Sequence, residues 1–130
     1  MLKIVRLVIA LGFVSLLSCS KNDDPANGNN GSISGQWVIH YYWDEKNETS
    51  DFAGYVFEFL GNGQLKAKKG STTVTGSWQE TSSKFIINFG NDPVLEEIND
   101  DWEKIERTST LIHLEDDNPG QDDELHFVRL

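Results

Sequence analysis

The chain has little of several residue types, and each shortage excludes something. Its 130 residues include one cysteine, so no disulfide can form within a chain. Lysine and arginine number 11 against 21 aspartates and glutamates, for a formal net charge of −10. That sign disfavours contact with nucleic acid phosphates or an anionic lipid surface, so we expect neither partner. The 3 prolines, set against 4 Trp, 3 Tyr and 7 Phe, indicate one folded domain without room for a second.

Motifs for catalysis are also missing from the sequence. It contains no Gly-x-Ser-x-Gly elbow, and Gly61-Asn62-Gly63 precedes an expected strand, whereas a phosphate-binding loop precedes a helix. Residues 115–124 have a calcium-like composition without the ligand order of an EF-hand, so we interpret them as a solvated loop. We therefore expect no enzyme activity, no catalytic residue, no metal site and no cofactor.

What the sequence does contain begins with an export signal at residues 1–18. Lys3 and Arg6 form a basic start, and residues 7–17 are an apolar run that is too short to span a bilayer. The lone thiol, Cys19, comes directly after this run and before a polar stretch, where no core is available to bury it.

The sequence Leu16-Leu17-Ser18-Cys19 resembles the lipobox of bacterial lipoproteins. The resemblance implies that residues 1–18 are removed and that Cys19 carries lipid, which anchors the protein in the outer membrane. Its partner would then be the membrane itself, and the domain would lie on the periplasmic face or on the cell surface.

Residues 19–34 are rich in Gly, Asn and Asp and predict a flexible acidic tether. The stretch Lys21 to Asp24 is similar to the acidic surface-export signal of some Gram-negative lipoproteins, and a solvated linker explains it equally well. We leave that choice open.

From Gly35 onward the hydrophobic period is close to two, and turn residues recur every eight to twelve positions, which is typical of an antiparallel sandwich or barrel. One segment, residues 92–99, breaks the period and predicts a short capping helix that begins at Asp92. The expected strands are 36–43, 54–60, 64–69, 72–79, 84–89, 101–107, 110–116 and 123–130.

The turns also predict the pairing of the strands. A loop at residues 61–63 sets Phe57 opposite Ala67, and the next turn sets Leu65 opposite Gly76. Further along the chain, the same reasoning sets Trp78 opposite Phe85 and Ile112 opposite Phe127. Strand 101–107 stays ambiguous, since Trp102 or Ile105 can face inward but both cannot without a bulge.

Gly35-Gln36-Trp37 resembles the Gly-x-Trp signature of lipocalins, and Thr75-Gly76-Ser77-Trp78 is similar to small lipocalin-like domains of bacterial lipoproteins. The resemblance implies an all-β domain over residues 35–130, a small eight-stranded antiparallel up-and-down barrel. In that family the tryptophan plugs the closed end beneath an arginine, so Trp37 would lie under Arg129 as a cation–π pair.

Two functions remain open for such a barrel. It is an envelope binding module that holds a small hydrophobic ligand inside, or it is a filled barrel whose exposed aromatic rim binds a protein or a glycan. Candidate residues for the ligand pocket are Tyr41, Trp43, Phe57, Ala67, Gly76 and Trp78.

Overall fold

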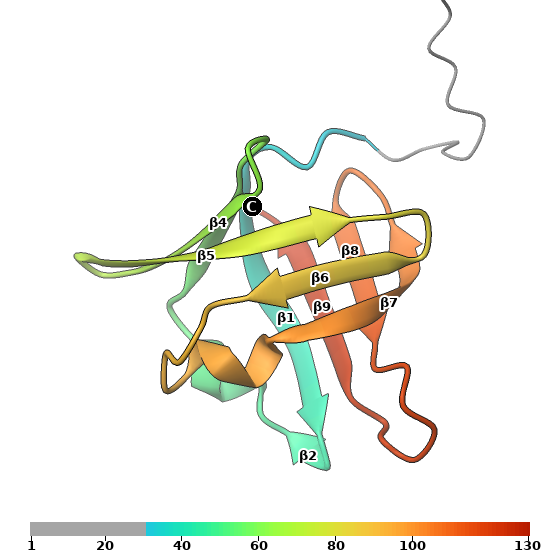
Figure 1. Cartoon of the computed structure of the whole chain (residues 1–130). Coiled ribbons are helices and arrows are strands. Elements are labelled where there is room, and N and C mark those ends of the chain that lie inside the picture. Colours follow the sequence, from blue (N-terminus) through green and yellow to red (C-terminus); the bar gives the residue numbers. More distant parts are fainter. Residues whose placement is uncertain (1–30) are drawn as a thin grey trace, which may run out of the picture.

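The strands of the protein follow one another around a single antiparallel sheet in a computed structural model, which describes residues 31–130 (Figure 1). The last strand pairs with the first, so the sheet closes into an up-and-down barrel of eight strands, as predicted. A two-residue strand, β2, pairs only with β1. The strands are β1 (Gln36–Asp44), β2 (Lys46–Asn47), β3 (Val56–Phe59), β4 (Gln64–Lys69), β5 (Thr72–Glu80), β6 (Lys84–Asn88), β7 (Asp100–Arg107), β8 (Leu111–Glu115) and β9 (Glu124–Arg129).

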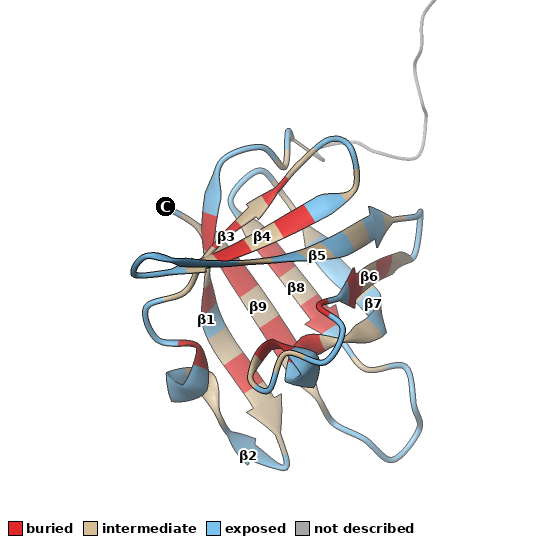
Figure 2. Ribbon diagram, turned by 60° about the vertical axis from the view of Figure 1, so that its left-hand side comes forward, coloured by how far each residue is buried: buried red, intermediate tan, exposed pale blue. Residues whose placement is uncertain are grey.

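Three of the four predicted hairpin registers are confirmed. Phe57 pairs with Ala67, Leu65 with Gly76, and Ile112 with Phe127. Both positions of each pair face the inside of the barrel, because residues directly opposite each other lie on the same face of a sheet. Figure 2 shows this alternation of buried and less buried positions along β8 and β9.

The register between β5 and β6 was predicted wrongly. Trp78 pairs with Ile87, two positions from the expected Phe85. The cause is the turn after β5, where the Lys84 amide donates to the Thr81 hydroxyl at 2.9 Å and the Thr81 amide donates to the Lys84 carbonyl at 2.9 Å. This bonding moves the turn one residue along the chain and keeps the same face of each strand inside.

A bulge in β1 reverses the predicted direction of two aromatic residues. The pairing with β9 shifts between Ile39 and Tyr41, so Tyr42 is buried, at 1% exposure, while Tyr41 and Trp43 lie on the outer wall. One extra residue in a strand changes the face of every residue beyond it. The prediction that Tyr41 and Trp43 point inward was therefore wrong.

A second bulge, in β7, resolves the ambiguity of that strand. The register shifts between Lys104 and Glu106, with Trp102 buried at 1% exposure and Ile105 exposed at 47%. Trp102 therefore belongs to the core.

Aromatic rings fill much of the barrel interior. Phe59 contacts Trp37, Trp78, Phe85 and Phe127, all nearly edge to face, with ring centres 5.4 to 6.3 Å apart. Such edge-to-face pairs add to the stability gained from burying the rings. The interior around Phe59 is thus a packed core.

Two single-turn 3-10 helices cap one end of the barrel. The predicted helix at residues 92–99 is only η2 (Leu95–Ile98), where Asp92 Oδ1 accepts hydrogen bonds from the Val94 and Leu95 amides at 3.1 and 2.9 Å. The other, η1 (Thr49–Phe52), was not predicted. Both meet Tyr42, whose hydroxyl donates to the Glu97 carbonyl at 2.9 Å and whose amide donates to Thr49 Oγ1 at 2.9 Å.

Residues 31–34 pack against the opposite end. The Trp37 indole donates to the Ile33 carbonyl at 2.8 Å, and Arg107 donates to the Gly31 carbonyl at 3.3 Å. The tether was predicted to extend through residue 34, and these contacts extend the folded domain back to Gly31. Cys19 and the predicted signal at residues 1–18 lie outside the described residues.

Within residues 31–130, no helix has the length and apolar character needed to cross a membrane.

Candidate functional site

The predicted ligand pocket inside the barrel is occupied by side chains of the protein. Phe57 and Ala67 are fully buried, and the half-buried Trp78 donates its indole hydrogen to the Leu60 carbonyl at 2.9 Å. Beside Gly76 lies Phe89: a methyl group added at Gly76 would lie 2.7 Å from the Phe89 ring. The space that a ligand was expected to use there therefore holds the Phe89 ring.

The six predicted pocket residues consequently do not form one site. Phe57, Ala67, Gly76 and Trp78 lie on strands β3, β4 and β5, directed inward, while bulged β1 directs the other two, Tyr41 and Trp43, outward. No local residue pattern marks that bulge, and Phe89 was not among the predicted pocket residues.

The structure does bring the predicted plug residues together. The Arg129 guanidinium lies 4.8 Å from the centre of the Trp37 ring, and Trp37 has no exposed surface. Arg129 also donates to the carbonyl oxygens of Ser34 and Ser109, both at 2.6 Å, and to that of Ser32. One guanidinium thus covers the tryptophan and holds the N-terminal segment against the barrel.

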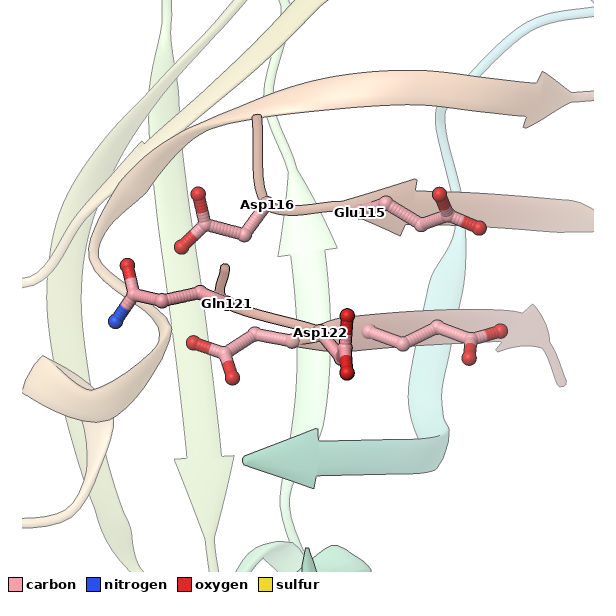
Figure 3. Close-up of a pocket in the computed structure, with 6 residues that line it drawn as sticks. Glu115, Asp116, Gln121 and Asp122 are labelled. Atoms are coloured by element: carbon pink, nitrogen blue, oxygen red, sulfur yellow. The ribbon is translucent and has the colours of Figure 1, made fainter. Parts of the chain in front are cut away.

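A concave surface lies at the other end, in the hairpin between β8 and β9. It encloses about 210 Å³, and Figure 3 shows Glu115 and Asp116 on one arm with Gln121 and Asp122 on the other. A neighbouring hollow, also of about 210 Å³, is bounded by Trp43, the β1–β2 turn and the same loop. We call these two hollows the acidic end; their lining residues are Trp43, Asp44, Glu45, Glu115, Asp116, Gly120, Gln121, Asp122, Asp123 and Glu124.

Carboxylates at the acidic end repel one another. Burial raises the pKa of Asp123, and the neighbouring charges of Asp44 and Asp116 raise it further. At the start of β7, burial raises the pKa of Asp100 to about 6; the hydrogen bond from the Asp101 amide opposes this rise, and the Asp101 side chain and the charge of Asp116 add to it. Anions that are crowded in this way are stabilised by a nearby cation.

One turn residue at the acidic end has an uncommon backbone conformation. Glu45, between β1 and β2, has a φ of 57°, in the left-handed region that residues other than glycine seldom adopt. Such strain is often found at functional positions. The loop at residues 115–124 was predicted to be solvated surface, although 13 of the 21 acidic residues lie between Asp92 and Glu124.

The two ends of the barrel therefore differ in charge. Arg107 and Arg129 hold residues 31–34 at one end, and the carboxylates gather at the other. In Figure 1 the C-terminus and the start of the described chain lie together, opposite β2 and the β8–β9 loop. The chain thus enters the domain at the end farther from the acidic hollows.

The sequence matches no family model and no curated protein. A solved structure shares the fold. It is the crystal structure, at 1.00 Å resolution, of a DUF4847 family protein from Bacteroides vulgatus ATCC 8482, with 15% sequence identity and a TM-score of 0.57. The match covers 75% of this chain and 94% of the other. At that identity the likeness shows the barrel architecture alone.

Proposed function

We propose that the chain is a lipid-anchored binding module of the bacterial outer membrane, without catalytic activity, whose partner docks on the acidic end. The observation that carries this proposal is Phe89 against Gly76, because the space predicted for a small hydrophobic ligand is taken by the protein's own ring. The two hollows of the acidic end, by contrast, are open to a ligand from outside.

The chemistry of the acidic end favours a basic segment of a partner protein. Neighbouring carboxylates raise the pKa of Asp123, and a Lys or Arg of a partner would offset their repulsion; Trp43 at the edge offers a ring face for a cation–π contact. A glycan would use the same indole by stacking, with Gln121 as a hydrogen-bonding group. The excess of carboxylates over neutral polar groups in the lining favours the basic protein segment.

The proposed anchor suits this arrangement. A lipid on Cys19 would connect to the barrel through residues 31–34, which pack at the end opposite the acidic hollows. The acidic end would accordingly project away from the membrane, where a protein partner has access to it.

Labelling with palmitate tests the anchor. The chain expressed in a Gram-negative host should incorporate the label and sediment with outer membranes, and Cys19→Ser should abolish both. Unchanged sedimentation of the Cys19→Ser variant would contradict the lipid anchor.

Nuclear magnetic resonance titration tests the docking surface. A lysine-rich peptide should shift the Trp43 indole signal and the amides of residues 116–123, and added salt should weaken the effect because the attraction is between exposed charges. The double variant Asp122→Asn with Asp123→Asn should bind more weakly, whereas Glu106→Gln, which removes an exposed charge elsewhere, should bind as the parent does. Equal weakening by Glu106→Gln would contradict a site at the acidic end, and salt-resistant shifts with an oligosaccharide would favour a glycan.

A further inference from the structure

Two of the three histidines in the sequence meet on the outer wall of the barrel. His113 on β8 lies directly opposite His126 on β9, and the ring centres are 4.1 Å apart at an angle of 50°. Tyr41 on β1 packs against the other side of His126, with ring centres 5.2 Å apart, and so restricts its movement.

A carboxylate oxygen lies between the two rings. Glu124, two residues before His126 on β9, places Oε1 2.6 Å from His126 Nε2 and 3.0 Å from His113 Nε2. The donor atoms of these three residues all lie within 4.8 Å of one another. Glu115, opposite Glu124 on β8, adds an oxygen 3.4 Å from His113 Nε2.

His113 Nε2 is buried from solvent and makes no hydrogen bond of acceptable geometry, although the Glu124 oxygen is close to it. A buried polar atom without a partner is uncommon in a folded protein and calls for an explanation. The carboxylates of Glu115 and Glu124 are also direct cross-strand neighbours, which is unfavourable for two like charges. A cation bound among these groups would satisfy the nitrogen and neutralise the carboxylates.

We propose that His113, His126 and Glu124 form a binding site for a divalent transition-metal ion of the Zn²⁺ class, with Glu115 available as a fourth ligand. Zinc holds nitrogen and oxygen ligands at about 2.0 to 2.2 Å, so tetrahedral neighbours lie roughly 3.3 Å apart. The observed separations of 2.6, 3.0 and 3.4 Å require only small side-chain shifts to reach that geometry. Imidazole nitrogens select Zn²⁺ over Ca²⁺ and Mg²⁺, which prefer oxygen ligands.

The hairpin makes this a preorganised site. Both histidines alternate with buried neighbours, Ile112 and Leu114 on β8 and Leu125 and Phe127 on β9, so their directions are fixed by the core. The wall carries an excess of negative charge from the acidic end, which concentrates cations near it. Glu115 and Glu124 also line the acidic end, and the two proposals are tested separately because the docking variants change Asp122 and Asp123 while the zinc variants change His113, His126 and Glu124.

Calorimetric titration of the full chain with Zn²⁺ tests the site. The chain should carry Cys19→Ser, which removes the thiol as a competing ligand, and a tag without histidine. We expect one Zn²⁺ per chain, with affinity at least tenfold lower in His113→Asn, His126→Asn and Glu124→Gln. His40→Asn, which removes the exposed third histidine, should bind as the parent does, and excess Ca²⁺ or Mg²⁺ should not displace the zinc.

A second measurement needs no substitution at the site. In nitrogen-15 spectra of the histidine rings, Zn²⁺ should shift the signals of His113 and His126 and leave that of His40 unchanged. Binding of several ions, affinity that survives the histidine variants, or ring signals that do not move on saturation would each overturn the proposal.

Discussion

Gly76 and Phe89 together determine whether the barrel has space for a ligand beside β5. The missing side chain of Gly76 leaves a recess on β5, and Phe89, 5% exposed, fills it with its ring. A methyl group at Gly76 would also lie 2.4 Å from the Asn88 carbonyl oxygen. The recess therefore has room for the edge of the Phe89 ring but not for a side chain at position 76. The two residues act as one packing unit.

Phe89→Ala should open a cavity at this recess. We expect a loss of about 3 to 5 kcal/mol in the free energy of unfolding, because a large core side chain is removed. A small apolar molecule such as benzene should restore part of that loss, since a dry apolar cavity binds such ligands. Urea denaturation with and without benzene measures both effects. Ile105→Ala, at an exposed position, serves as the control, and a Phe89→Ala variant indifferent to benzene would contradict the filled recess.

Arg129→Lys should loosen the N-terminal segment while keeping the charge. A guanidinium donates to several carbonyls at fixed angles, and an ammonium does not reproduce that geometry, so we expect a cost of about 1 to 2 kcal/mol. Hydrogen exchange at residues 31–36 should speed up more than exchange in β4. Uniform acceleration across the barrel would instead indicate general destabilisation without a specific role in holding the segment.

At the scale of strands, the sequence predicts a pairing register where local turn residues determine it, and does not predict one between strands that are distant in the chain. Hairpins carry their register in local turn residues, so the pairing of Ile112 with Phe127 was predicted, and it already implied that His113 faces His126. The bulge after Ile39 arises from pairing β1 with β9, the two ends of the barrel sequence, and no local residue marks it. The sequence therefore contained the histidine pair but not the outward turn of Tyr41.

The bulge of β7 creates a buried ion cluster that sequence patterning also missed. Glu80 Oε1 lies 3.0 Å from Lys104 Nζ and 3.6 Å from Arg107 Nε, and the three side chains are 20%, 7% and 6% exposed. Burial lowers the pKa of Arg107, and its Nε has no hydrogen-bond partner. The Glu80 carboxylate is thus the shared counter-charge of Lys104 and Arg107, whose side chains are largely buried.

Glu80→Gln should therefore destabilise the domain strongly. Removing the shared anion leaves two buried cations without a counter-charge, and we expect a loss of about 3 kcal/mol. Lys104→Met should cost less, since Glu80 keeps Arg107 as its partner. Urea denaturation of both variants, judged by far-ultraviolet circular dichroism, measures the difference. Equal losses in the two variants would show that the cations do not share the carboxylate.

Over the whole molecule, charge is arranged along the barrel axis, with arginines at the tether end and carboxylates at the other. Burial and like charges raise the pKa of Asp100, Asp123 and Glu97 together. Asp123 lines the acidic end, and Asp44 and Asp116, which also line it, raise the pKa of Glu97 and Asp100, so the repulsion at neutral pH extends beyond the two hollows. Clustering these carboxylates lowers the stability of the folded protein. Their presence therefore fits a role in binding cations or basic partners.

Mild acid should therefore stabilise the protein. Asp100 has a pKa of about 6 in the folded state against an ordinary 3.8, so the folded chain holds this proton more tightly than the unfolded chain does. Its favourable contribution is fully present below pH 3.8 and is lost as the pH rises through 6. Glu58 has the opposite sign, because its bond to Lys68 lowers its pKa and that contribution is lost as the pH falls. We accordingly expect a higher melting temperature at pH 5 than at pH 7.5.

Asp100→Asn isolates this effect. The amide oxygen can still accept the hydrogen bond from the Asp101 amide, which is 2.7 Å long, while the charge is removed. The variant should be more stable than the parent at pH 7.5, and its melting temperature should change less between pH 5 and 7.5. Glu58→Gln should do the reverse at pH 7.5, lowering stability through loss of the Lys68 ion pair. An Asp100→Asn variant that melts lower than the parent at pH 7.5 would show that the Asp100 carboxylate is stabilised by its surroundings, contrary to the burial and the repulsion from Asp116 inferred here.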